Sequence, residues 1–146
     1  MAGFAKKFES ATVEWPTPQD LFDKLDAEFG FTTDVAATPD NAKCKHYYTQ
    51  EQDGLKQTWR GVCWMNPPYG RAMVDWLKKA IRETWNGTTT VCLIPARTNT
   101  TWWHDLCQKY GGYGLCGAVR SLVVLITDCH NLLQLWCLEE GQNYDV

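Results

Sequence analysis

The chain has 146 residues, a length that suits one domain with a substantial hydrophobic core. Its formal net charge is −3, which excludes a protein drawn to nucleic acid by an overall basic field, so any such partner needs a local basic patch. The seven cysteines are irregularly spaced and no long apolar run is present at the N-terminus, so we expect reduced thiols in a cytoplasmic protein with no membrane span.

The N-terminal part predicts a loose arm followed by an amphipathic helix. Residues 1–14 are polar and mixed, and Trp15-Pro16-Thr17-Pro18 then favours a helix entry with Thr17 as N-cap and Pro18 at the first helical position. The apolar face of this helix comprises Leu21, Phe22, Leu25 and Phe29, and Gly30 ends it. Trp15 and Thr17 have two open roles: a local anchor and cap, which the spacing favours, or contacts with a bound cofactor.

A strand is expected over residues 31–37, ending in Asp34-Val35-Ala36-Ala37. Small residues such as Ala36 after an acid let a ligand approach the backbone, while Asp34 can accept hydrogens from ribose or an amino group. Asp is also common at strand ends for structural reasons. No Gly-x-Gly-x-x-Gly pattern follows this strand, which argues against a dinucleotide site there.

Residues 38–58 predict a polar loop. Its segment 43–48 combines two lysines with two tyrosines, which suits either a contact with a phosphate or base or an ordinary surface loop. A zinc site built on Cys44, His46 and distant partners is a minor alternative, and we expect no metal.

The most informative stretch is Val62-Cys63-Trp64-Met65-Asn66-Pro67-Pro68-Tyr69-Gly70. Residues 62–65 have the content of a buried strand, and the two prolines stop it because neither can donate to a ladder. Asn66 and Tyr69 are therefore held at the carboxyl end of a strand, where open α/β sheets bind ligands. A strand that simply ends in a rigid proline turn is the structural alternative.

This turn suits chemistry on a planar exocyclic amine such as that of adenine. The Asn66 side-chain carbonyl and the Pro67 backbone carbonyl can each accept one amine hydrogen, which favours a more tetrahedral nitrogen aimed at a methyl donor. Tyr69 can stack on a base taken out of its duplex. Because Asn66 is neutral, such catalysis rests on positioning and electrostatics.

After the turn, residues 71–85 predict an amphipathic helix and residues 90–95 a buried strand, so residues 62–95 form a βαβ unit with parallel strands. Arg97 and Thr98 follow at the ligand-binding end, where Arg97 suits a phosphate or base contact or a surface salt bridge. A short helix carrying Trp102 and Trp103 is expected next, closed by Gly111-Gly112. Residues 119–126 and 132–138 suggest a terminal pair of strands.

Taken together, these motifs resemble the small phage-type DNA adenine methyltransferases, the Dam-like family. The match extends from Trp15 to about Leu106, and its ordered motifs are Trp15-Pro16-Thr17-Pro18, Asp34-Val35-Ala36-Ala37, Asn41-Ala42-Lys43-Cys44, Asp53-Gly54-Leu55, Asn66-Pro67-Pro68-Tyr69, Leu93-Ile94-Pro95-Ala96-Arg97-Thr98 and Trp102-Trp103-His104.

The resemblance implies a single Rossmann-like α/β domain over 1–146, with a small, mostly parallel central sheet flanked by helices. It implies S-adenosylmethionine as cofactor, adenine in DNA as substrate and direct transfer without metal or covalent intermediate. The implied catalytic residues are Asn66, Pro67, Pro68 and Tyr69. The implied cofactor-binding residues are Trp15, Thr17, Pro18, Asp34, Ala36 and Asn66. Tyr69, Arg97 and Thr98 are the implied substrate contacts.

Residues 110–146 depart from the family pattern, because the basic Gly-Arg-Leu strand and the later Ser-Ala-Pro turn are missing. A frameshift in the gene is one hypothesis for this tail. Two other functions stay open from the sequence. The same turn serves a methyltransferase acting on protein glutamine or RNA, and a degenerate domain would bind DNA or cofactor without catalysis.

Overall fold

The computed structural model describes residues 16–95, 97, 99–108, 112–115, 122–127, 135–136 and 143–144. The expected arm at 1–14, and the site candidates Trp15 and Thr98, lie outside the described residues.

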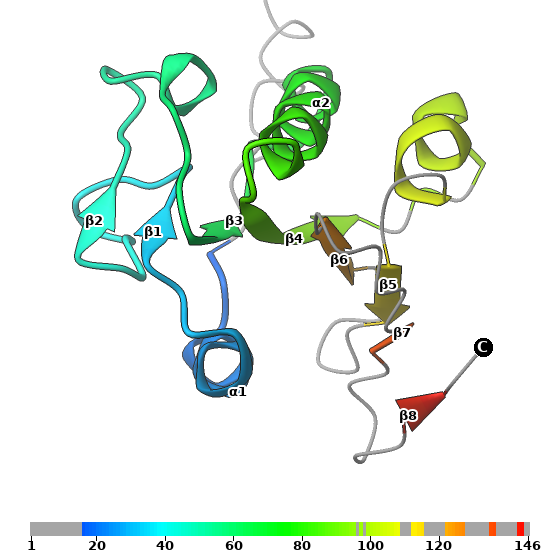
Figure 1. Ribbon diagram of the computed structural model, residues 1–146, viewed down its shortest axis with the longest axis horizontal. Helices are drawn as coiled ribbons and strands as arrows, with labels where there is room; N and C mark the ends of the chain where they lie inside the picture. Colours follow the sequence, from blue (N-terminus) through cyan, green and yellow to red (C-terminus); the bar gives the residue numbers. More distant parts are fainter. Residues whose placement is uncertain are drawn as a thin grey trace, which may run out of the picture.

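A mixed sheet of six strands in the order β2-β1-β3-β4-β6-β5 runs through the molecule (Figure 1). The parallel part contains β1 (Thr33–Asp34), β2 (His46–Tyr47), β3 (Val62–Met65) and β4 (Thr89–Pro95). The antiparallel part contains β5 (Gly112–Leu115) and β6 (Leu122–Thr127). A separate two-stranded sheet pairs β7 (Leu135–Trp136) with β8 (Asn143–Tyr144). The predicted α/β class with a mostly parallel sheet is confirmed.

Helices cover both faces of the sheet, as Figure 1 shows. Helix α1 (Gln19–Phe29) lies on one face, and α2 (Ala72–Thr84) lies on the other with the short η1 (Gly54–Lys56) and η2 (Trp103–Gln108). Alternate side chains of β3 and β4 face opposite ways, as strand geometry requires. Those packed on the α2 side are Cys63, Met65, Cys92 and Ile94. Those packed on the α1 side are Trp64, Val91 and Leu93.

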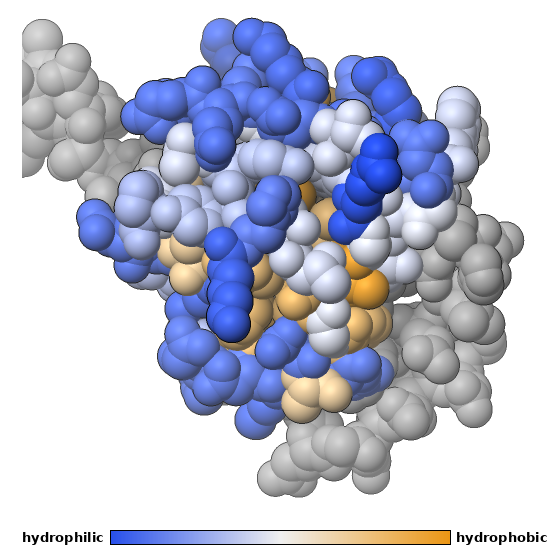
Figure 2. Space-filling view, turned by 60° about the vertical axis from the view of Figure 1, so that its left-hand side comes forward, coloured by the Kyte–Doolittle hydropathy of each residue, from blue (hydrophilic) through white to orange (hydrophobic). Residues whose placement is uncertain are grey.

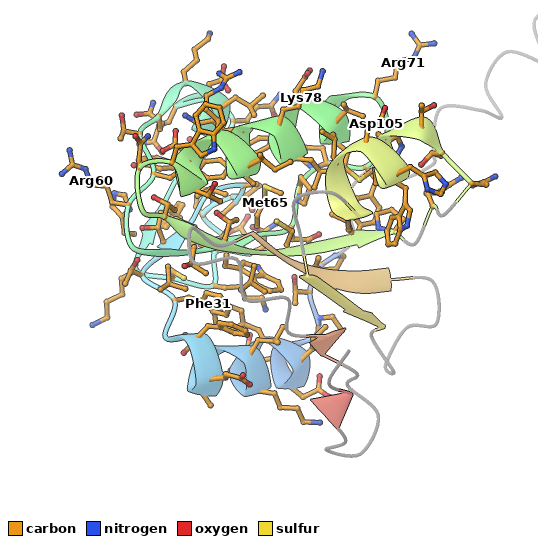
Figure 3. The ribbon with its side chains drawn as sticks, turned by 45° about the vertical axis from the view of Figure 1, so that its right-hand side comes forward. Phe31, Arg60, Met65, Arg71, Lys78 and Asp105 are labelled. Carbon is orange, nitrogen blue, oxygen red and sulfur yellow. The ribbon has the colours of Figure 1, made fainter. Side chains whose placement is uncertain are left out.

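Figure 3 makes this division visible, with Met65 between the sheet and α2 and Phe31 between the sheet and α1. Phe31 joins an aromatic group in which its ring centroid lies 5.4 Å from that of Phe22 and 5.4 Å from that of Trp64. Such tilted ring contacts add to the stabilisation from burial, because ring edges and faces carry opposite partial charge.

Helix α1 has the predicted apolar face but not the predicted cap. Leu21, Phe22 and Leu25 are buried, and Gly30 ends the helix in the left-handed region at φ 64°. The expected N-cap role of Thr17 is wrong, as is the placement of Pro18 inside the helix. Pro18 occupies the cap position, and no side chain caps the helix there.

The βαβ unit is confirmed closely. Strand β3 has the predicted bounds, α2 covers residues 72–84 and β4 pairs in parallel with β3. Met73, Trp76, Leu77 and Ala80 of α2 are buried, which explains their helical spacing in the sequence. Asn86 and Gly87 follow the helix, and Gly87 takes a φ of 81°, open to glycine without strain.

Three details differ from the sequence-based expectation. The strand expected over 31–37 is limited to Thr33–Asp34, and the polar loop contains an additional short strand, β2. The predicted strand at 119–126 is confirmed as β6, but it pairs with β4 and β5 rather than with the segment 132–138, whose strand β7 pairs with β8. Gly112 begins β5 rather than closing the preceding helix.

Figure 2 shows one face of the molecule, on which hydrophilic side chains surround a smaller area of hydrophobic surface. Among the large apolar side chains of the described residues, Trp85 at the end of α2 is highly exposed, at 84%. None of the described helices is long and apolar enough to cross a membrane.

Candidate functional site

A cavity of about 890 Å³ lies where the chain leaves the carboxyl ends of β1, β2 and β3. Its lining is drawn from residues 16–17, 34–43, 48–55 and 64–68, together with Trp76 of α2. Segments far apart in the sequence therefore meet at one edge of the sheet. This is the edge at which open α/β sheets bind ligands, and the volume is in the upper part of the range of roughly 300–1,000 Å³ typical of ligand pockets.

Asp34 lies at the end of β1 and is 2% exposed. Its Oδ2 accepts a hydrogen bond from the Lys43 backbone N–H at 3.0 Å, and its Oδ1 accepts one from the Ala36 N–H at 3.3 Å. Burial raises the pKa of the Asp34 carboxyl above its ordinary value, although these two hydrogen bonds and the charge of Lys43 partly offset that effect. Asp34 therefore both orders the segment 36–43 and places acceptor oxygens at the cavity.

The turn after β3 brings Asn66, Pro67 and Pro68 to the cavity, as predicted from the strand that precedes them. The Asn66 amide group is half-buried, and its Nδ2 donates a hydrogen bond to the Thr17 hydroxyl oxygen at 3.1 Å. Its Oδ1 is shielded from solvent, so an amine that reaches this oxygen must first displace a neighbouring atom. Asn66 and Asp34 nevertheless line one continuous cavity.

Two of the predicted cofactor contacts, Thr17 and Ala36, also line the cavity. Thr17 is buried, at 7% exposure, and belongs to the segment that leads into α1. Pro18 is not among the described lining residues. Its carbonyl accepts the Phe22 N–H at 3.1 Å, so the observed contact of Pro18 is with α1.

The structure does not bring the predicted substrate contacts into the cavity lining. Tyr69 is half-buried and packs against both hydrophobic clusters of the core. Arg97 is exposed just beyond the end of β4, and its N–H donates to the Pro95 carbonyl at 3.0 Å. Thr98 lies outside the described residues.

Sequence reasoning missed several lining residues, because their positions depend on long-range packing. The described residues that line the cavity include the carboxylates of Asp34, Asp40 and Asp53 and the lysine Lys43. Asp53 also forms an ion pair with the exposed Lys56 at 3.2 Å. The ammonium of Lys43 donates to the Gln19 side chain at 2.7 Å. The cavity therefore has an acidic lining that favours a positively charged ligand.

Gly54 forms part of the cavity wall at a very close backbone approach. A Cβ on Gly54 would lie 2.2 Å from the Val35 carbonyl oxygen and 2.9 Å from an atom of the Trp76 ring. The Gly54 carbonyl accepts a hydrogen bond from the buried Trp59 indole N–H at 2.8 Å. The Asp53-Gly54-Leu55 motif in the sequence points to this segment, but it does not explain why a glycine is required at position 54.

Within the described part of the chain, no three His, Cys, Asp or Glu side chains are grouped so as to hold a metal ion. Cys44 and Cys63 are free thiols, and burial is the main cause that raises the pKa of each to about 12. Cys63 and Cys92 are fully buried, which confirms their predicted place in the core.

The family model described as DNA N-6-adenine-methyltransferase (Dam) matches residues 5–111, which is well over half of the chain.

Two relatives carry the same description. The chain is 33% identical over 98 residues to a DNA N-6-adenine-methyltransferase of Escherichia phage T1, covering 65% of this chain and 41% of the relative. It is also 33% identical over 98 residues to a protein of that name in Haemophilus phage HP1, covering 65% of this chain and 56% of the relative. The matched region thus spans about half the length of these curated relatives.

Proposed function

Because the chain belongs to the DNA N-6-adenine-methyltransferase (Dam) family, we propose that it transfers a methyl group from S-adenosylmethionine to the exocyclic amino nitrogen of adenine in DNA. The observation that carries this proposal is the cavity that joins Asp34 to the turn Asn66-Pro67-Pro68. A methyl donor and a target amine have to meet in one space, and the fact that Asp34 and this turn line the same cavity supports such a meeting point.

The charge of the cavity supports S-adenosylmethionine as the donor. This molecule has a positive sulfonium and a positive ammonium group, and Asp34, Asp40 and Asp53 line the cavity. The small side chain of Ala36 leaves the backbone accessible beside Asp34, whose carboxylate oxygens have further acceptor capacity for hydroxyl or amino hydrogens. The residues present therefore fit the donor.

S-adenosylmethionine, when bound, would supply an electrophilic methyl carbon, and its sulfur would keep the electron pair of the broken carbon–sulfur bond as the amine nitrogen takes the methyl group. Once the atom that shields the Asn66 Oδ1 has moved aside, this oxygen and the Pro67 carbonyl oxygen would accept the two amine hydrogens and orient the nitrogen lone pair toward that carbon. No residue of the turn acts as a strong base, so the surplus amine proton leaves to water after transfer.

The same edge of the sheet offers basic groups for the DNA backbone. Arg71 follows the turn and Arg97 follows β4, and both side chains are exposed. Neither arginine side chain makes an ion pair or a side-chain hydrogen bond to another described residue, so both guanidinium groups are available for phosphate. Acidic groups thus line the donor cavity, while arginines lie next to the turn that would receive the base.

A methylation assay on the full chain tests the proposal. Labelled S-adenosylmethionine is offered with unmethylated duplex DNA, with RNA and with glutamine-containing peptides, and we expect label on adenine N6 in DNA. Label that appears only in peptide or RNA overturns the choice of substrate.

The variant Asn66→Ala provides the matched control. We expect it to lose at least about 100-fold in kcat while retaining its circular dichroism spectrum, because a lost positioning acceptor costs several kcal/mol at the transition state. Equal activity in both proteins contradicts the role assigned to the turn. With DNA as the proposed substrate, we expect the enzyme to act in the cytoplasm.

A further inference from the structure

A single hydrogen bond connects the segment before α1 to the turn after β3. The Asn66 Nδ2 donates to the Thr17 Oγ1 at 3.1 Å, across 49 positions of sequence. Thr17 is 7% exposed, and both residues line the cavity. Water therefore competes weakly for this bond, which is stronger in such surroundings than at an open surface.

The bond matters because a neutral amide can contribute to catalysis only through its position. The terminal torsion of asparagine is broad, so the plane of the amide is poorly fixed without a partner. A hydroxyl that holds the nitrogen end restricts the plane of the whole group, including the direction of the carbonyl at its other end. Small changes in such an angle are costly where the barrier is lowered by orientation.

The hydrogen bond from Asn66 is the contact that the structure shows for the Thr17 hydroxyl. It does not cap α1, because Pro18 occupies the cap position and no side-chain cap is present. Because the Asn66 Oδ1 is shielded from solvent in this conformation, a neighbouring atom has to move before an amine can reach it. We propose that Thr17 is a positioning residue that keeps the plane of the Asn66 amide fixed for methyl transfer while that atom moves. This inference rests on the proposed function, and it adds a role for Thr17 distinct from contact with the donor.

The kinetic test compares Thr17→Val with Thr17→Ser. Valine has nearly the shape of threonine but cannot hydrogen-bond, so we expect kcat to fall about 10-fold, which is the effect of losing one good hydrogen bond. The KM for DNA should change less than twofold, and kcat is measured at saturating S-adenosylmethionine, so that any loss of a donor contact by Thr17 does not enter it. Serine retains a hydroxyl and should recover most of the loss.

Thr88→Val is the matched control for the removal of a buried threonine hydroxyl. Thr88 is 1% exposed, and its hydroxyl donates to the Trp59 carbonyl at 3.0 Å. Thr88 immediately precedes β4, at the amino end of the parallel strands, whereas the turn with Asn66 follows β3 at their carboxyl end. This variant should lower thermal stability while leaving kcat unchanged, which separates general destabilisation from loss of positioning.

A spectroscopic measurement tests the contact without any turnover. In nitrogen–proton spectra, the Asn66 side-chain amide is assigned by the loss of its signals in Asn66→Asp. We expect one of its two protons to exchange slowly with water in the wild type, and at least several-fold faster in Thr17→Val.

The outcomes separate the two proposals. If the wild type methylates DNA but Thr17→Val keeps its kcat, or loses only donor affinity, the positioning role is wrong. If the wild type methylates nothing, the proposed function fails, and unchanged amide exchange in Thr17→Val then also rejects the contact.

Discussion

Asp34 carries a carboxylate where burial disfavours its charge. Its pKa is raised by desolvation, so on acidification it takes up a proton at higher pH than an ordinary aspartate. The folded state then binds the proton more tightly than the unfolded chain. The contribution of Asp34 to stability is therefore more favourable at low pH and decreases as pH rises through the folded-state pKa.

Binding of a cationic donor should show the opposite dependence. Only the ionised carboxylate attracts the positive charges of S-adenosylmethionine, so the affinity should fall as pH is lowered through the folded-state pKa of Asp34, which burial raises above its ordinary value. Calorimetric titration from pH 8 downward, over the range in which the protein stays folded, measures this change. In Asp34→Asn the affinity should be weak and nearly constant over that range, and a wild type that behaves like this variant would argue against Asp34 as a donor contact.

The thiols of the half-buried Cys44 and the fully buried Cys63 give a second prediction for individual residues. Cys44 and Cys63 have pKa values raised to about 12, so at pH 8 only about one thiol in ten thousand is ionised at each position. Because the thiolate is the reactive form, we expect iodoacetamide to label both very slowly in the folded protein and quickly in urea. Peptide mass spectrometry reads each cysteine separately, and rapid labelling of the folded protein would contradict these buried environments.

At the scale of elements, η1 is wedged between the end of β1 and α2. The variant Gly54→Ala places a methyl group against the Val35 carbonyl, which cannot yield without moving the segment after β1. We expect a loss of about 1–3 kcal/mol in the free energy of unfolding and a clear loss of donor affinity. Thermal denaturation and calorimetry measure the two effects.

Gly30→Ala is the control for this prediction. Gly30 has a φ of 64° and open space around its missing Cβ, and it lies at the far end of α1. The variant Gly30→Ala should lower the free energy of unfolding by about 1–2 kcal/mol through backbone strain alone, and donor affinity should stay unchanged. If both variants bind the donor equally, η1 does not shape the cavity.

The elements that could be predicted are those whose own residues determine them. The apolar run and the prolines define β3, and the helical spacing of Met73, Trp76 and Leu77 defines α2. Strand β2 has no such signal. His46 and Tyr47 become a strand because they pair with Thr33 and Asp34, and this pairing depends on tertiary contacts.

The residues of the candidate site also separate into those predictable from local sequence and those placed by tertiary contacts. The turn at Asn66 and the acid at Asp34 were predicted from local sequence, because each follows a recognisable strand. The contact between Thr17 and Asn66 could not be predicted, since a threonine before a helix is commonly a cap and its actual partner lies 49 residues away. Trp76 lies within the predicted amphipathic helix, and it is both buried and part of the cavity wall, a second role that the helical pattern does not predict.

At the scale of the whole molecule, basic groups lie at both ends of the parallel strands. Figure 3 shows Arg60 and Arg71 at opposite ends of the molecule. If DNA binds at the carboxyl end, Arg71→Gln and Arg97→Gln should each reduce the slope of log affinity against log salt concentration by about 1. Fluorescence anisotropy over a salt series measures this slope.

Arg60→Gln is the control for the DNA surface. Arg60 is equally exposed but precedes β3, so it lies away from the turn. Its replacement should leave the salt dependence unchanged. A slope that falls equally in all three variants would indicate diffuse attraction rather than a defined DNA surface.

The pairing of β4 with β6 has a consequence for handling the protein. Six residue pairs, from Thr90↔Thr127 to Pro95↔Leu122, cover one side of β4, and β6 comes from beyond residue 111, where the family match ends. If this cover were lost, β4 would become an outermost strand with unsatisfied backbone groups, a known template for intermolecular association. Damage to the C-terminal strands should therefore first appear as aggregation on storage or heating, before any change in the chemistry of the turn.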